Sequence, residues 1–144
     1  MHAGAQIRPA EAAPVTRTIR VRDVMHDGVL TCGRDESLSI VARLMAEHRV
    51  HSIVVTDADQ AATALWGVVS DLDLVAAASV RDLDEQTAGV AAATPALMIA
   101  PDDTLQRATQ QMVEHSLTHL VVVDGSRPVG VLSTLDVARA LARD

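Results

Sequence analysis

The sequence predicts a mixed α/β (α+β) fold of two β-α-β-β-α repeats packed with pseudo-twofold symmetry. The main observation is that the stretch GVVSDLDLVAA, at 67–77, returns as GVLSTLDVARA at 130–140, with the same spacing of glycine, serine and aspartate. A second segment, which begins at His48, returns 67 positions later at His115. In both halves a helical pattern is followed by a β-branched run, so each half is one copy of a duplicated unit.

Each repeat is expected to open with a short strand, near 29–31 in the first copy and 97–99 in the second. A helix follows at about 38–47, where apolar residues recur at helical spacing. Polar side chains just before a helix cap its free N–H groups. The candidate caps are Asp35 or Ser37 in the first copy and Asp102 or Asp103 in the second.

The strands SIVVT, at 52–56, and HLVVV, at 119–123, do not alternate between polar and apolar residues, so we expect both faces of each to be buried. Asp124 and Gly125 form a turn signal before the next strand, PVGVLS. A short helix then opens at each serine–aspartate motif. One unit of about 60 residues buries too little surface to be stable alone, so the two should pack face to face.

The repeats also set the expected domain organisation. We expect a flexible tail at 1–19, a first repeat at 20–80, a charged linker at 81–87 and a second repeat at 88–144. Equivalent residues of the two repeats are 67 positions apart up to the strands SIVVT and HLVVV, and 63 positions apart from the next strand on. The difference lies in the loop between these two strands, which is longer in the first repeat. Length differences that are confined to a loop are typical of a duplicated fold.

Composition excludes several classes of function. The net charge of −7 and the absence of Phe and Tyr argue against nucleic-acid binding, which uses basic surfaces and aromatic platforms. All twelve basic residues are Arg, so a lysine nucleophile is excluded. A single cysteine, the absence of a signal-peptide pattern and the absence of an apolar run of ~20 residues predict a soluble cytoplasmic protein with no membrane partner.

The repeated serine–aspartate pair has two interpretations. Ser70 and Ser133 can cap the helices that follow, with Asp73 and Asp136 in the first helical turn, where a carboxylate favours the helix dipole. The same groups also suit a nucleotide. The helix N-terminus and the serine hydroxyl can donate to a phosphate, while the carboxylate accepts from two ribose hydroxyls. The duplication of the pair favours a binding function.

The repeat order, the strand entry HRVHSIVVTD and the Gly-x-x-Ser-x-x-Asp runs resemble a tandem pair of CBS domains, the Bateman module. The resemblance covers about 20–143. It implies adenosine-type ligands such as AMP, ADP, ATP, S-adenosylmethionine or NAD, with Ser70 and Asp73 in one site and Ser133 and Asp136 in the other.

Family members often carry a basic residue near the strand entry that reaches the ligand phosphates. On this basis His48, Arg49 and His51 are expected to serve the first site, and Thr118 and His119 the second, which has no arginine at its strand entry.

Other chemistries have less support. Histidine pairs at 48/51 and 115/119 lack an obvious third ligand, so we assign no metal site. Cys32 is expected to be a small buried residue, and Asp71 and Asp73 do not face each other on a helix. We find no catalytic residues, do not assign the chain as an enzyme, and expect no required cofactor.

Two functions remain. One is a nucleotide-sensing module that regulates an unidentified effector protein, and the other is a structural dimerisation module with vestigial sites. The helix after the first motif carries no charge at 74–80, so we expect a second copy of the chain to cover it in a homodimer.

Overall fold

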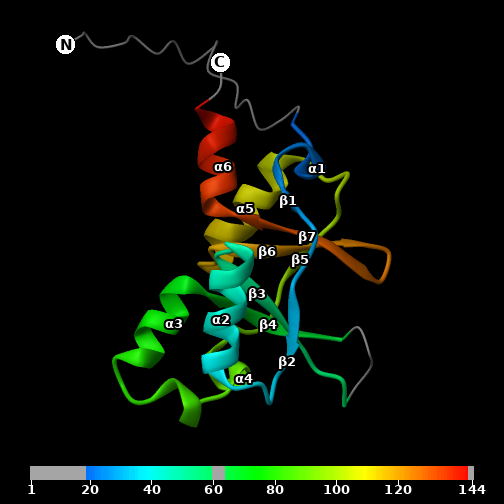
Figure 1. Cartoon of the computed structure of the whole chain (residues 1–144). Helices are drawn as coiled ribbons and strands as arrows, with labels where there is room; N and C mark the ends of the chain where they lie inside the picture. Colours follow the sequence, from blue (N-terminus) through cyan, green and yellow to red (C-terminus); the bar gives the residue numbers. More distant parts are fainter. Residues whose placement is uncertain (1–18, 60–63, 143–144) are drawn as a thin grey trace, which may run out of the picture.

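The structure is a computed structural model that describes residues 19–59 and 64–142. The expected tail at 1–19 lies outside the described residues except for its last member. The predicted β-α-β-β-α order is confirmed in both copies (Figure 1). The first repeat consists of β2 (Thr31–Gly33), α2 (Leu38–His48), β3 (Ser52–Thr56), β4 (Leu65–Ser70) and α3 (Asp71–Ala78). The second consists of β5 (Met98–Ile99), α5 (Leu105–His115), β6 (His119–Asp124), β7 (Arg127–Ser133) and α6 (Thr134–Leu141).

Short elements come before the β-α-β-β-α order in each half of the chain. α1 (Val21–Val24) and β1 (His26–Asp27) come before β2, and η3 (Leu83–Glu85) and α4 (Ala88–Ala91) come before β5. The one-turn η3 lies inside the segment expected to be a linker, and the proposed repeat boundaries stay a prediction. Within the described residues, no helix is both long and apolar enough to cross a membrane.

The strands form two sheets, and one strand of the first half of the chain pairs with the sheet of the second repeat. β2, β3 and β4 form the sheet of the first repeat, whereas β7, β6 and β5 form that of the second. β1 comes directly before β2 in the sequence of the first repeat, yet it pairs antiparallel with β7, with His26 opposite Val131. Figure 1 shows α1 and β1, in blue, beside the elements of the second repeat. The segment that leads into one repeat therefore completes the sheet of the other.

The glycine of each motif makes this exchange possible. A Cβ atom at Gly130 would lie 2.6 Å from the carbonyl oxygen of His26, and one at Gly67 would lie 2.5 Å from that of Ala93. Real Cβ atoms do not approach backbone oxygens so closely, so only glycine lets these segments lie so close to β7 and β4. The repeated glycine thus has a packing role in both copies.

The core confirms that both faces of the central strands are buried. Ile53 and Val55 of β3 are fully buried in the helix-covered core of the first repeat. On the opposite side of the strands, a separate cluster joins the two repeats. Its buried members are Val54, Val68, Val121 and Val131. Because these valines come from both copies, burial of their side chains fixes how the repeats face each other.

The helix caps agree with the sequence in the first repeat and differ in the second. Ser37 caps α2, as predicted, by accepting a hydrogen bond from the Ser39 N–H. For α5 the predicted caps, Asp102 and Asp103, are wrong, because Thr104 accepts from the Arg107 N–H at 3.1 Å. Asp103 is engaged in the preceding turn, where it accepts from the Ala100 N–H at 3.0 Å.

Candidate functional site

Both serine–aspartate motifs are complete capping boxes. In the first, Ser70 Oγ accepts from the Asp73 N–H at 3.2 Å, and Asp73 Oδ2 accepts from the Ser70 N–H at 2.8 Å. In the second, the corresponding distances for Ser133 and Asp136 are 3.1 and 2.8 Å. The capping interpretation is therefore confirmed for both copies. Each box uses one carboxylate oxygen, and within the described residues Oδ1 of both aspartates accepts no hydrogen bond.

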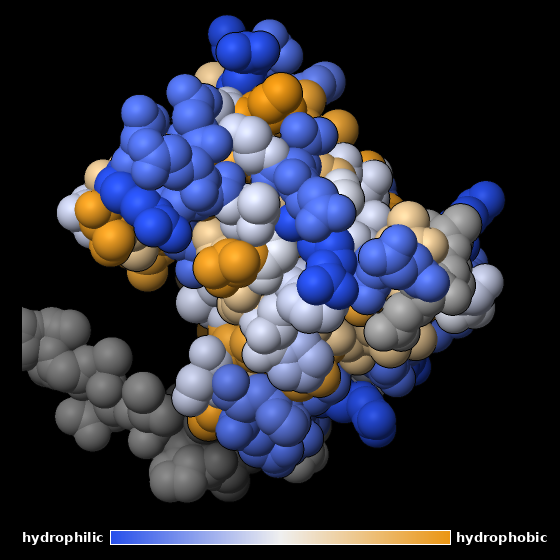
Figure 2. Space-filling view, turned by 90° about the horizontal axis from the view of Figure 1, so that it is seen from below, coloured by the Kyte–Doolittle hydropathy of each residue, from blue (hydrophilic) through white to orange (hydrophobic). Residues whose placement is uncertain are grey.

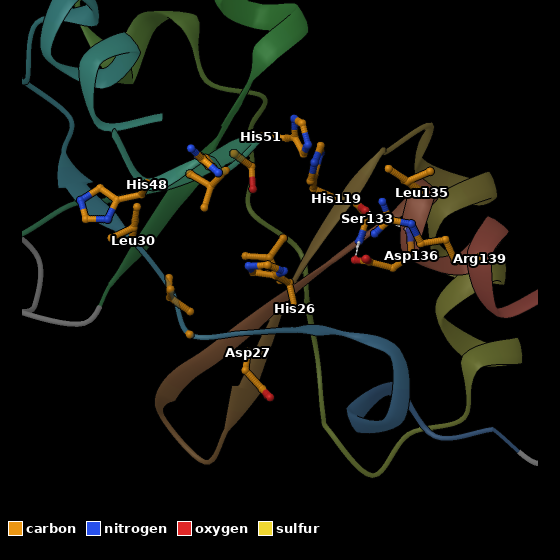
Figure 3. A pocket seen from close by; sticks show the side chains of 16 residues that line it. His26, Asp27, Leu30, His48, His51, His119, Ser133, Leu135, Asp136 and Arg139 are labelled. Carbon is orange, nitrogen blue, oxygen red and sulfur yellow. Dashed lines mark hydrogen bonds between the residues drawn. The ribbon is translucent and has the colours of Figure 1, made fainter. Parts of the chain in front are cut away.

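The two motifs differ in the space beside them. Ser133 and Asp136 line a cleft of about 600 Å³, which lies within the usual volume range of small-molecule sites. We call it the Asp136 cleft. In Figure 3, His48 and Leu30 lie on one side of this cleft, Ser133, Asp136 and Arg139 lie on the other, and His26 lies between them.

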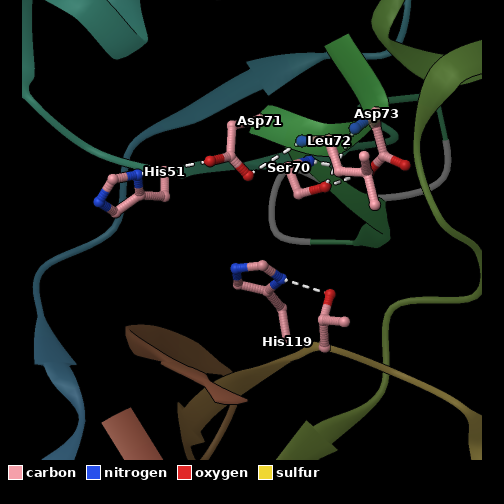
Figure 4. A network of polar contacts seen from close by, with 7 residues as sticks. His51, Ser70, Asp71, Leu72, Asp73 and His119 are labelled. Atoms are coloured by element: carbon pink, nitrogen blue, oxygen red, sulfur yellow. Dashed lines mark hydrogen bonds and ion pairs between the residues drawn. The ribbon is translucent and has the colours of Figure 1, made fainter. Parts of the chain in front are cut away.

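Four side chains lie in a different site from the one predicted. His48, Arg49 and His51 were expected beside Ser70 and Asp73, but they line the Asp136 cleft. Thr118 was expected beside Ser133 and Asp136, but it lies beside Asp73. The reason is the face-to-face packing of the repeats, since the entry to β3 faces the motif of the opposite repeat. His51 remains close to its own repeat as well, with Nδ1 3.6 Å from Asp71 Oδ2 (Figure 4).

The site at the first motif is almost filled. Asp73, Thr118 and His119 line a space of only about 20 Å³, which we call the Asp73 cleft. That volume holds about one water molecule. The space is narrowed by side chains that come from the segment before β5 and from the turn after α5. They are Pro95, Ala96, Leu97 and Leu117.

The repeat alignment shows why the clefts differ. Arg49 corresponds to Ser116, and Arg139 to Ala76, so both arginines of the Asp136 cleft are replaced by small residues in the other copy. Gly28, in the Asp136 cleft, corresponds to Pro95 in the filled one. The open cleft is therefore also the one with positive charge.

Sequence reasoning missed some residues of the cleft. Arg139 follows Asp136 by three positions on α6, and this spacing, which places two side chains on one helix face, was a usable signal. His26 and Leu30 had no such signal, because they reach the cleft only through the pairing of β1 with β7 and the course of the chain after it.

Histidines are concentrated at this site. Of the five histidines that the structure describes, four line the Asp136 cleft, namely His26, His48, His51 and His119. Each imidazole can offer an N–H donor to an anionic ligand. In the part of the chain that the structure describes, no three His, Cys, Asp or Glu side chains come together as ligands for one metal ion.

His119 lies between the two clefts and lines both. Its Nδ1 is 2.9 Å from Thr118 Oγ1, and in Figure 4 its ring points from β6 toward Ser70 and Asp73. Burial lowers the pKa of His119, because the charged imidazolium loses its hydration. The carboxylates of the two motifs oppose this effect, but the pKa stays below its ordinary value.

Comparison with known proteins identifies the family. The sequence matches the CBS domain over residues 21–80 and again over 88–143. The chain is a pair of CBS domains. The repeat order and the paired motifs described above are those of this CBS pair, so the predicted family and fold class are confirmed.

Relatives of the CBS pair cover most of its length. Hypoxic response protein 1 of Mycobacterium tuberculosis (strain H37Rv) is 30% identical over 122 residues, which are 83% of each chain. A crystal structure of Hypoxic Response Protein I with two coordinated zinc ions has 28% identity and a TM-score of 0.67, and the match covers 85% of this chain and 98% of the other. The CBS domain pair of protein MJ0100, solved with 5′-methylthioadenosine and S-adenosyl-L-methionine, shares the fold at a TM-score of 0.71 and 18% identity, over 84% of this chain and 94% of that one.

Proposed function

We propose that this CBS pair is a regulatory module that binds one adenosine-containing nucleotide per chain, in the Asp136 cleft. The observation that carries the proposal is that Ser133, Asp136, Arg49 and Arg139 share a cleft of about 600 Å³. A hydroxyl and a helix N-terminus suit a phosphate, and a carboxylate with an unused oxygen suits a ribose.

The wall of the cleft also has an apolar part. Val29 and Leu30 from the segment before β2, together with Val131 and Leu135, line the same space. Ligand sites typically combine such apolar walls with a few converging polar groups. A purine ring is expected to lie against these side chains, while Asp136 Oδ1 accepts from the ribose. The MJ0100 pair supports this proposal only as a protein of the same fold that holds adenosine compounds.

Binding of one nucleotide, not two, follows from the contrast between the clefts. Asp73 has the same capping geometry as Asp136, but the space beside it is about 20 Å³. A nucleotide there would have to displace Pro95, Leu97 and Leu117, and the two leucines also pack against the core of the second repeat. We expect the first motif to serve as a helix cap alone.

We propose further that the module is a homodimer that uses α3. Leu72, Val75 and Val80 are 70, 66 and 77% exposed at this end of the first repeat. In α6 the position that corresponds to Ala76 is Arg139, so the second copy lacks a continuous apolar face. Figure 2, viewed from the first-repeat end of the molecule, shows apolar side chains on the surface among polar ones. A second copy would cover the face of α3.

A purely structural dimerisation module is the second candidate, and the filled Asp73 cleft together with the exposed face of α3 favours it. A thermal-shift panel separates the two functions. A ligand that binds only the folded chain stabilises it by about 2.7 kcal/mol at a concentration one hundred times its dissociation constant. The sensor proposal expects at least one of AMP, ADP, ATP, NAD or S-adenosylmethionine to raise the melting temperature, with one molecule bound per chain by calorimetry. No shift and no heat at millimolar concentration would leave the structural role.

A further inference from the structure

Two arginines enter the Asp136 cleft from different repeats. Arg49 ends α2 in the left-handed conformation, with φ of 54°, and lines the cleft at the entry to β3. Arg139 lies on α6 one turn after Asp136 and lines the cleft as well. The cleft is thus lined by an arginine from each repeat, and Arg139 lies on the same helix face as the carboxylate that is proposed to hold the ribose.

Neither guanidinium has an ion-pair or hydrogen-bond partner within residues 19–59 and 64–142. Arg34 shows the contrast, since it lies 3.2 Å from the buried carboxylate of Asp57 and 4.0 Å from the centre of the Trp66 ring. An arginine that is held by a carboxylate and an aromatic ring serves the fold, whereas one that lines a cleft without a partner can bind an anion. Its planar fork matches the oxygens of a phosphate.

The carboxylates that line the cleft do not outweigh the preference of its arginines for an anion. Among the described residues, Asp27 and Asp136 are the two carboxylates that line it, against two arginines and four histidines. Asp136 already accepts from the Ser133 N–H through Oδ2, and the proposed ribose contact uses its other oxygen. The part of the ligand beyond the ribose therefore meets arginine and histidine side chains. The positions equivalent to Arg139 and Arg49 in the other copy are Ala76 and Ser116, and no arginine lines the Asp73 cleft among the described residues.

We propose that the Asp136 cleft selects its ligand by charge. It takes an adenine nucleotide with two or three phosphates, held by Arg49 and Arg139, and it disfavours S-adenosylmethionine, whose sulfonium is positive. This inference rests on the proposed adenosine site and narrows its ligand class. The two arginines are then the residues that determine specificity.

Calorimetry on the full chain tests the selection directly. The probes are adenosine, AMP, ADP, ATP and S-adenosylmethionine, each at 50 and at 300 mM salt. We expect ATP to bind at least tenfold more tightly than AMP or S-adenosylmethionine, and the ATP affinity to fall with salt while that of adenosine stays constant. This comparison uses only the wild-type chain, so it does not depend on any variant folding.

Arg49→Gln and Arg139→Gln are expected to weaken ATP roughly tenfold to a hundredfold and to leave adenosine unchanged. Arg43→Gln is the matched control, because Arg43 is exposed on α2 and does not line the cleft. Equal affinity for adenosine and ATP, tighter binding of S-adenosylmethionine, or ATP binding that both variants retain would overturn the charge selection and leave the adenosine site in place. If none of the five compounds binds, the proposed function itself fails.

Discussion

Arg49 and Asp136 line the same cleft, although they belong to different CBS repeats and lie far apart in the sequence. Each repeat contributes its strand entry to the motif of the other. Neither repeat therefore holds the proposed site alone, and changes at the contact between repeats should alter ligand binding.

The two aspartates give a matched pair of variants. Asp73→Ala and Asp136→Ala remove the same capping-box contacts, so each should lower the free energy of unfolding by about 1 kcal/mol. Only Asp136→Ala should weaken an adenosine ligand, by roughly tenfold to a hundredfold, because only Asp136 lines the open cleft. Urea unfolding and calorimetry on both variants measure the two effects. Equal loss of ligand in both variants, or loss in Asp73→Ala alone, would contradict the assignment of the site.

Gly130→Ala should destabilise the fold. The added Cβ would lie 2.6 Å from the His26 carbonyl oxygen, so β1 and β7 must move apart, and such overpacking typically costs about 1–3 kcal/mol. Gly33→Ala is the control, since a Cβ there meets no atom within 4 Å and should change the free energy of unfolding by less than about 0.5 kcal/mol. If urea denaturation shows the same stability for both variants, the close approach of β1 to β7 at Gly130 is not a constraint on the fold.

His119 should make the fold sensitive to acid. Burial lowers its pKa in the folded chain, so the unfolded chain takes up this proton at a higher pH than the folded one. The free energy of unfolding should therefore fall as the pH drops from about 6.5 toward the lowered pKa of the folded state. Urea unfolding at a series of pH values should show a smaller fall for His119→Gln than for wild type.

His115→Gln is the control for this measurement, because His115 is exposed at the end of α5. Its pH dependence should follow wild type. A wild-type slope that His119→Gln leaves unchanged would show that other groups cause the acid sensitivity.

The proposed dimer should depend on α3. Val75→Glu places a charge on its exposed apolar face and should convert the dimer to a monomer in sedimentation velocity at micromolar concentration. Val113→Glu is the matched control, because Val113 is 80% exposed on α5 and should leave the dimer intact. A monomeric wild type, or a Val75→Glu variant that still sediments as a dimer, would refute this use of α3.

The sequence by itself determined the elements and their order. The signals for helices, strands and helix caps depend on interactions between residues close in sequence. The first residues of α2, α3 and α6 could therefore be predicted from the sequence alone. The duplicated segments also allowed the family and the positions of both serine–aspartate motifs to be predicted from the sequence. Where local signals competed, as among the polar residues at 102–104, the sequence did not decide which one caps α5.

Only the tertiary structure decided which side chains share a cleft and which cleft is open. The valines that join the repeats, such as Val54 and Val121, set the face-to-face packing, and this packing carries Arg49 to the motif of the opposite repeat. The volume beside each motif then depends on side chains such as Pro95 and Leu117, which come from other parts of the chain. Contacts between distant segments depend on how whole surfaces pack together. The local sequence around Ser70 and Ser133 is nearly the same in both copies, so it could not indicate which of the two clefts is open.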